Sequence, residues 1–106
     1  MLGGGMNMNR MGKQLQDMQK RIAKVEEDLR ERIVEATSGG GMVSVKLNGV
    51  EEIVAVKIED QVLASGDRAM LEDLVMSAVN EGIKKAKKLR ETEMAKVTGV
   101  SLPGLI

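Results

Sequence analysis

The most constraining feature of this sequence is a heptad repeat in its first third. Apolar residues recur there at alternating steps of three and four, which places them in one seam along an α-helix. The seam consists of Met8, Met11, Leu15, Met18, Ile22, Val25 and Leu29. A helix from Met8 to about Arg32 would be roughly 37 Å long at 1.5 Å per residue. That length exceeds the width of a domain of 106 residues, so part of the helix should project or pair with another helix.

Three strand-like segments follow this helix and predict an antiparallel meander. They occupy residues 33–38, 42–48 and 50–58. The middle segment alternates apolar and polar residues, so its apolar residues Val43, Val45 and Leu47 lie on one face. The last segment returns to that face with Val50, Val54, Val56 and Ile58. One side of the predicted sheet is therefore apolar and must be covered.

Glycines mark both connections of the meander. Gly39, Gly40 and Gly41 turn the chain between the first two segments. Asn48 and Gly49 form the dipeptide preferred in two-residue type I′ turns, because both central residues of that turn take a positive φ. We therefore expect a tight hairpin between the second and third segments.

A second helix is predicted to cover the apolar side of the sheet. Residues 60–66 indicate a loop, and Asp67 is a suitable N-cap for the helix that follows. The helix should run to about Val97 and end at Gly99, since glycine favours helix ends. Its apolar residues recur at helical spacing, and they are Leu71, Leu74, Val75, Ala78, Val79, Ile83, Ala86 and Leu89.

These elements predict one domain over residues 1–106, with an α+β fold in the order α-β-β-β-α. The sheet is three-stranded and antiparallel, the first helix is long and projecting, and the second helix is C-terminal. Residues 1–7 are expected to form a disordered lead-in, and residues 98–106 an extended tail.

The composition of the core favours a homodimer. The chain has no Phe, Trp or Tyr, and aromatic side chains contribute the largest buried areas. Aliphatic residues and nine Met must fill the interior instead. Because a domain this small is marginally stable on its own core area, association with a second copy is expected.

Several classes of function are disfavoured by residue types that are missing. The sequence has no His and no Cys, which removes the common bases and nucleophiles and the usual zinc ligands. We therefore predict neither an enzyme nor a protein with a metal, cofactor or small-molecule substrate. The N-terminus lacks an apolar signal region, and the longest aliphatic run, Ile53 to Val56, is far too short to span a membrane. A cytoplasmic protein is expected.

The cations are sorted into two segments although 16 basic and 16 acidic residues balance over the chain. Residues 1–25 hold five cations and one acid, a net charge of +4, and residues 84–96 hold six cations and two acids, also +4. Basic helices can lie along DNA phosphates without contacting bases. Without aromatic residues to stack on single strands, double-stranded DNA is the favoured partner. The predicted contact residues are Arg10, Lys13, Lys20, Arg21, Lys24, Lys84, Lys85, Lys87, Lys88 and Arg90.

Two alternatives stand beside this interpretation. The lysines of the second helix could be a solvated face, with Glu81 pairing with Lys85 and Glu91 with Lys87 at helical spacing. The chain could also be a protein-interaction adaptor whose Met-rich first helix offers a soft apolar seam to a partner.

The sequence resembles the YbaB/EbfC family over nearly its whole length. The resemblance rests on the Met- and Gln-rich stretch 11–19, the glycine turn and strand at 39–45, and the Asn48-Gly49 pair. It rests also on the segment 70–75 (MLEDLV), Asn80 and the closing Leu102-Pro103-Gly104. It implies a bacterial nucleoid-associated protein that binds DNA as a tweezer-shaped homodimer with projecting first helices, linked loosely to recombination and gene regulation. By this similarity, the DNA contacts would lie on the two helices.

Overall fold

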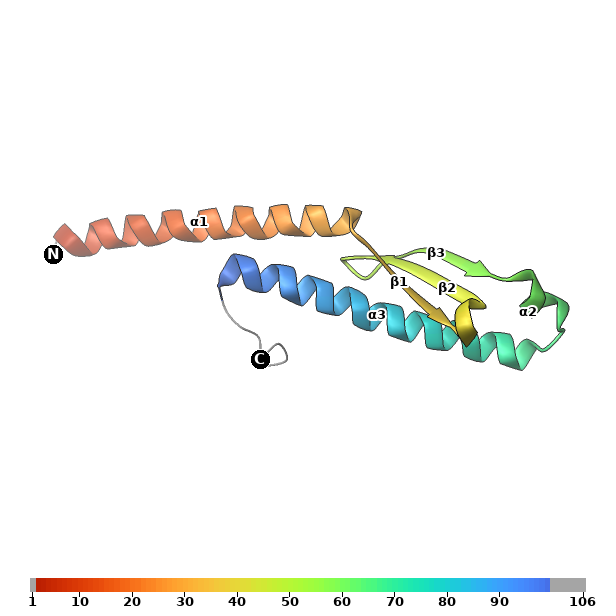
Figure 1. Ribbon diagram of the computed structural model, residues 1–106. Helices are drawn as coiled ribbons and strands as arrows, with labels where there is room; N and C mark the ends of the chain where they lie inside the picture. The colour runs from red at the N-terminus through yellow and green to blue at the C-terminus, as the bar shows by residue number, and fades with distance from the viewer. Residues whose placement is uncertain (1, 100–106) are drawn as a thin grey trace.

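The computed structural model describes residues 2–99, with side chains from Met8 onward. The elements in chain order are α1 (Leu2–Glu31), β1 (Ile33–Ser38), η1 (Gly39–Gly41), β2 (Val43–Asn48), β3 (Ile53–Ile58), α2 (Asp60–Ala64) and α3 (Arg68–Thr98). This is the predicted α+β fold, with one short helix, α2, added between the sheet and α3. Figure 1 shows α1 and α3 side by side over part of their length, with α1 continuing well past the end of α3.

Helix α1 begins at Leu2 rather than at Met8. Residues 2–7, expected to be a disordered lead-in, are therefore helical. Once a helix is formed, each added residue gains one hydrogen bond, so the long heptad segment can extend through the three glycines. At the other end of the chain, Thr98 still belongs to α3, and the rest of the expected extended tail, residues 100–106, lies outside the described residues.

Helix α2 replaces part of the loop expected at residues 60–66. Val62 is buried at its centre, so a helical turn allows this apolar side chain to reach the core while the chain crosses from β3 to α3. The start of α3 is as predicted, because the Asp67 side chain accepts a hydrogen bond of 3.0 Å from the backbone N–H of Met70. Its end is also as predicted, since Gly99 takes the left-handed conformation at φ 68°.

The sheet has the order β1-β2-β3 and is antiparallel throughout. Ala36 of β1 and Val56 of β3 both lie directly opposite Val45 of β2, so these three side chains point to the same face. A β-bulge between Lys46 and Leu47 shifts the register of β3.

The hairpin between β2 and β3 is longer than the predicted two-residue turn. Asn48 and Glu52 are joined by a backbone hydrogen bond of 2.9 Å, and the Glu51 N–H donates to the Asn48 carbonyl at 3.1 Å. The left-handed position is taken by Glu51, at φ 67°, and not by Gly49. Val50 therefore belongs to the loop, and the third strand begins at Ile53 instead of Val50.

The core lies between α3 and the first two strands. Its buried residues are Val43, Val45, Leu47, Ala78 and Ala86. Helix α3 packs against β1 and β2, and it approaches the sheet closely at Gly82, where a Cβ atom would overlap the Leu47 side chain. The prediction that this helix covers all three strands was wrong, because of the apolar residues of β3 only Ile58 packs against the core, and Val56 remains 50% exposed.

Candidate nucleic-acid interface

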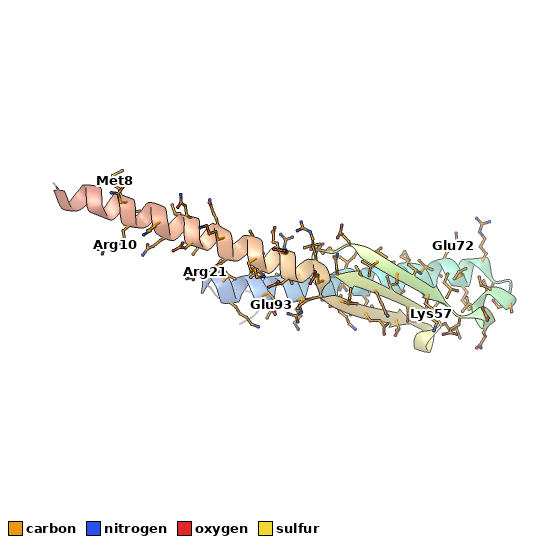
Figure 2. The ribbon with its side chains drawn as sticks, turned by 90° about the horizontal axis from the view of Figure 1, so that it is seen from above. Met8, Arg10, Arg21, Lys57, Glu72 and Glu93 are labelled. Carbon is orange, nitrogen blue, oxygen red and sulfur yellow. The ribbon has the colours of Figure 1, made fainter. Side chains whose placement is uncertain are left out.

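The predicted cations of α1 form one continuous surface, called here the basic stripe: Arg10, Lys13, Lys20, Arg21 and Lys24. At about 100° per residue, all five fall within an arc of about 100° around the helix. This arc is centred roughly 140° away from the apolar seam. All five residues are exposed, and Figure 2 shows Arg10 on the projecting part of α1.

Most of the basic stripe is free of acidic partners. Lys24 lies 3.6 Å from Asp28, one turn further along the same helix, and both side chains are largely exposed. Exposed pairs of this kind contribute about 0.3–0.5 kcal/mol, so Lys24 remains available to an anion. Within the described part of the chain, the other four cations of the stripe make no ion pair.

A groove forms where α1 passes the end of α3. It measures about 460 Å³, and the side chains around it are Lys20, Arg21, Lys24, Val25, Glu93, Lys96 and Val97. Lys96 therefore extends the basic stripe from a second helix, although it was not among the predicted contact residues. Its position in a cationic segment was the available signal. That α1 crosses α3 at this residue follows from tertiary packing alone.

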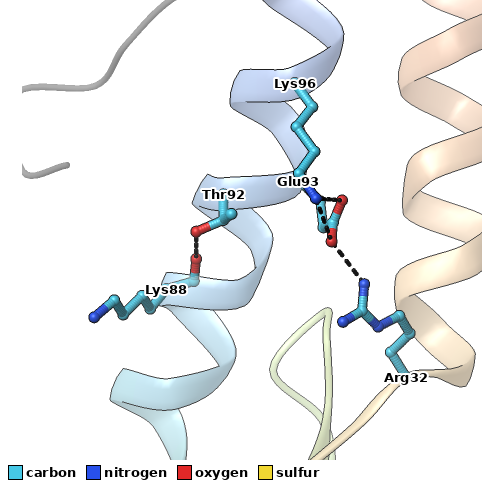
Figure 3. Close-up of polar contacts among 5 residues, drawn as sticks. All are labelled: Arg32, Lys88, Thr92, Glu93 and Lys96. Atoms are coloured by element: carbon cyan, nitrogen blue, oxygen red, sulfur yellow. Dashed lines mark hydrogen bonds and ion pairs between the residues drawn. The ribbon is translucent and has the colours of Figure 1, made fainter.

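One ion pair joins α1 to α3, and a second joins Arg32, the residue after α1, to α3. Arg90 donates to Glu26 at 2.8 Å, and Arg32 donates to Glu93 at 2.7 Å. Glu93 also lies 3.3 Å from the ammonium group of Lys96, as the close-up in Figure 3 shows. Hydrogen bonds from Arg32 and then from Lys96 favour the ionised carboxylate and hold the pKa of Glu93 below its ordinary value. Arg90 is thus engaged in joining the helices, unlike the cations of the stripe.

The lysines of α3 divide by their position around the helix. Lys84 and Lys88 lie roughly 120–160° from Gly82, the centre of the buried face, so they point away from the sheet. Lys87 is also exposed. These three are called the outer lysines, and within residues 8–99 they have no ion-pair partner. Lys85 instead donates to the backbone carbonyl of Glu35 in β1 at 2.9 Å.

The structure contradicts the solvated-face alternative in one respect. Neither Glu81 with Lys85 nor Glu91 with Lys87 forms an ion pair among the described residues. The basic stripe and the outer lysines nevertheless remain separate surfaces within one chain. The stripe reaches the groove beside α3, whereas the outer lysines face away from both the sheet and α1.

Charge is also separated along the length of the molecule. Residues 8–21 hold four cations and one acid, a net charge of +3, whereas residues 57–73 hold five acids and two cations, a net charge of −3. Figure 2 places Met8 and Arg10 towards one end and Glu72 towards the other. A chain of zero net charge thus presents a cationic end and an acidic end.

Neither a metal cluster nor a membrane helix emerges from the described residues. Within residues 2–99, no group of three or more His, Cys, Asp or Glu side chains could hold a metal ion. No helix in the same range is long and apolar enough to cross a membrane.

Comparison with known proteins decides the family. The sequence matches the YbaB/EbfC DNA-binding family over residues 4–101. The chain belongs to the YbaB/EbfC family. It is 47% identical to a nucleoid-associated protein of Thermoanaerobacter pseudethanolicus, over 96% of this chain and 93% of the relative. It is 43% identical to a nucleoid-associated protein of Desulfotalea psychrophila, over 94% of this chain and 95% of the relative.

A solved structure agrees with this YbaB/EbfC membership. The uncharacterized protein HP0035 from Helicobacter pylori superimposes with a TM-score of 0.77 at 35% identity, covering 84% of this chain and 94% of that one. The resemblance seen in the sequence is thereby confirmed, and the arrangement of helices and strands is that of a YbaB-like protein.

Proposed function

We propose that this YbaB/EbfC protein binds double-stranded DNA as a homodimer, mainly through phosphate contacts, and acts at the bacterial nucleoid in the cytoplasm. The observation that carries the proposal is a group of exposed predicted contact residues on α1 and α3 that make no ion pair among residues 8–99: Arg10, Lys13, Lys20, Arg21, Lys84, Lys87 and Lys88. Exposed cations in rows attract phosphates without reading bases. The names of the relatives support the same partner, and effects on nucleoid organisation and gene expression would follow from binding.

The contacting residues are proposed in two groups. The basic stripe, extended by Lys96, would follow one phosphate backbone along α1. The outer lysines would contact a second segment of backbone. Lys85 and Arg90, predicted from the sequence alone, would contribute less because each already has a partner within the fold. Lys96 would likewise contribute less than the stripe itself, because it pairs with Glu93.

The proposed homodimer is supported by the uncovered face of β3. Ile53, Val54 and Val56 are about half exposed, and β3 is an edge strand whose outer backbone groups have no strand partner in the sheet. Apolar edges of this kind favour pairing with another chain. A twofold axis at β3 would bury the same patch on both copies and would present two basic stripes in one particle.

The experiment is a titration of duplex and single-stranded DNA at several salt concentrations. We expect tighter binding to the duplex, with log K falling against log salt at a slope of about −0.9 per neutralised phosphate. Lys84→Glu with Lys88→Glu should weaken binding to all duplex sequences alike. Lys46→Glu with Lys57→Glu makes the same change of charge on the outer face of the sheet and should weaken it much less. Absence of duplex binding at low salt would reject the proposal.

The adaptor alternative keeps one observation in its favour, the exposed Met8, Met11 and Leu15 on the projecting part of α1. An adaptor would retain its protein partner after nuclease treatment and after reversal of Lys84 and Lys88. Affinity capture with both treatments separates it from a DNA-binding protein.

A further inference from the structure

The apolar seam of α1 is covered over only half of its length. Near the base of the helix, Leu29 is 1% exposed against the hairpin loop. Toward the tip, Met8 is 73% exposed and Leu15 is 60% exposed, and Met11 and Met18 are exposed as well. The heptad pattern runs unbroken through both halves. The tip therefore carries a coiled-coil seam that no other described element of the chain covers.

The residues beside this part of the seam are uncharged. In heptad terms Met8 and Leu15 occupy a positions, and Met11 and Met18 occupy d positions. The flanking e positions are then Gly12 and Gln19, and the flanking g position is Gln14. The e and g residues lie beside the partner helix and set which partner is accepted. The nearby cations Arg10, Lys13 and Lys20 fall at the outer c and f positions.

This distribution of charge distinguishes among occupants. An acidic helix or an anionic membrane would be matched by cations along the borders of the seam, but in the tip the cations lie across the helix from it. A second copy of the same helix would meet neutral flanks on both sides and no repulsion between like charges. It would also turn both basic stripes outward.

We infer that the tip of α1, residues 8–19, pairs with the same tip of a second copy in a two-stranded coiled coil. The segment spans fewer than two heptads, and helices this short associate weakly in isolation. Pairing should therefore depend on protein concentration. The inference does not require DNA binding, although chains held close together on one duplex would pair at a higher effective concentration.

The test compares two double variants of the full chain that add the same charge to α1. Met11→Glu with Leu15→Glu places carboxylates in the seam, whereas Asn9→Glu with Gln16→Glu places them at outer b positions. The mass of the particle is followed by light scattering and sedimentation over increasing protein concentration. We expect the wild type and the outer variant to grow beyond the mass of the β3 dimer as concentration rises, because each dimer would present two tips to other copies. The seam variant should stop at that dimer, with an association of tips at least about tenfold weaker.

Two outcomes would overturn the inference: wild type and seam variant of equal mass at every concentration, or an outer variant that dissociates as fully as the seam variant. Circular dichroism establishes that each variant keeps its helices. Leu15→Ala, which removes apolar contact while preserving helix propensity, gives an independent weaker version of the seam change. DNA binding of the same proteins is measured separately by titration with duplex. Absence of DNA binding with retained assembly would reject the proposed function but not tip pairing.

Discussion

Gly49 of the β2–β3 loop lies directly against Leu29 of α1. Its backbone N–H donates to the Leu29 carbonyl at 2.7 Å, and a Cβ atom on Gly49 would lie 2.7 Å from the Leu29 Cδ2 atom and 2.8 Å from the carbonyl oxygen. Glycine is needed here because two backbones approach closely, and not because the position has a positive φ. The contact connects the base of the projecting helix to the sheet.

Replacing Gly49 should loosen this connection. We expect Gly49→Ala to reduce the free energy of unfolding by about 1–3 kcal/mol, the usual cost of forcing an extra methyl group into a packed site. Glu51→Gly is the matched change in the same loop. It should instead stabilise the protein by roughly 1 kcal/mol, because Glu51 holds the left-handed conformation that glycine accepts without strain. Urea unfolding of both variants measures the difference, and a stabilised Gly49→Ala would contradict the close approach.

Two helical glycines offer a second matched pair. Alanine gains about 1 kcal/mol over glycine within a helix, both at Gly12 and at Gly82. Gly12 has open space around it, whereas a Cβ on Gly82 would overlap the buried side chain of Leu47. Gly82→Ala should therefore lower the free energy of unfolding, because overpacking the core costs about 1–3 kcal/mol. This cost equals or exceeds the gain in helix propensity. Gly12→Ala should raise helicity without destabilising the domain. Equal effects of the two changes would argue against tight packing of α3 on β2.

Glu93 should make stability depend on pH in the acidic range. Its pKa is lowered in the folded state, first by the hydrogen bond from Arg32 and then by that from Lys96. The stabilisation is therefore fully present above the unfolded-state pKa of about 4.3 and is lost as the pH falls through the lower folded-state pKa. The stability difference between wild type and Glu93→Gln should shrink towards acidic pH. A side-chain NMR titration that places Glu93 at the ordinary value for glutamate would refute the assignment.

Neighbouring residues on β3 distinguish the two faces of the sheet. Val56 shares the apolar face with Val45, whereas Ala55 lies opposite Lys46 on the polar face. At concentrations too low for the α1 tips to pair, Val56→Glu should give a folded monomer, because dimerisation at this face would bury an unpaired carboxylate at a cost of several kcal/mol. Ala55→Glu adds the same charge and should leave the dimer intact. Light scattering measures the mass of both variants. A wild type that is already monomeric at micromolar concentration would exclude the dimer itself.

The elements of the fold were predictable because their patterns are local. The heptad steps from Met8 to Leu29 specify a helix, the alternation around Val45 specifies a half-buried strand, and Asp67 and Gly99 mark the two ends of α3. The prediction of a two-residue hairpin turn was wrong for a non-local reason. Gly49 carried a familiar turn signal, but its neighbour across space, Leu29, determines why glycine is there.

In the candidate site too, features set by local sequence were predictable, and features set by tertiary contacts were not. Sorting cations by segment identified the basic stripe and the outer lysines, since both lie on regular helices. It did not distinguish the engaged Arg90 from the free Lys88, and it left out Lys96, because the crossing of α1 and α3 brings together residues more than 60 positions apart. The exposure of β3 was equally hidden, since the number of strands that one helix covers depends on how the helix crosses the sheet.

The opposite charges at the two ends of this 76 Å particle have a dynamic consequence. A molecule without net charge is drawn only weakly towards a distant polyanion, but one with a large dipole moment experiences a torque in its field. Near a duplex a single chain would rotate before it makes contact, with the start of α1 leading and α2 trailing, whereas in the proposed dimer the twofold axis would cancel the part of the dipole perpendicular to it. Salt would therefore act first on the orientation of the encounter, within a screening length of about 8 Å at physiological ionic strength.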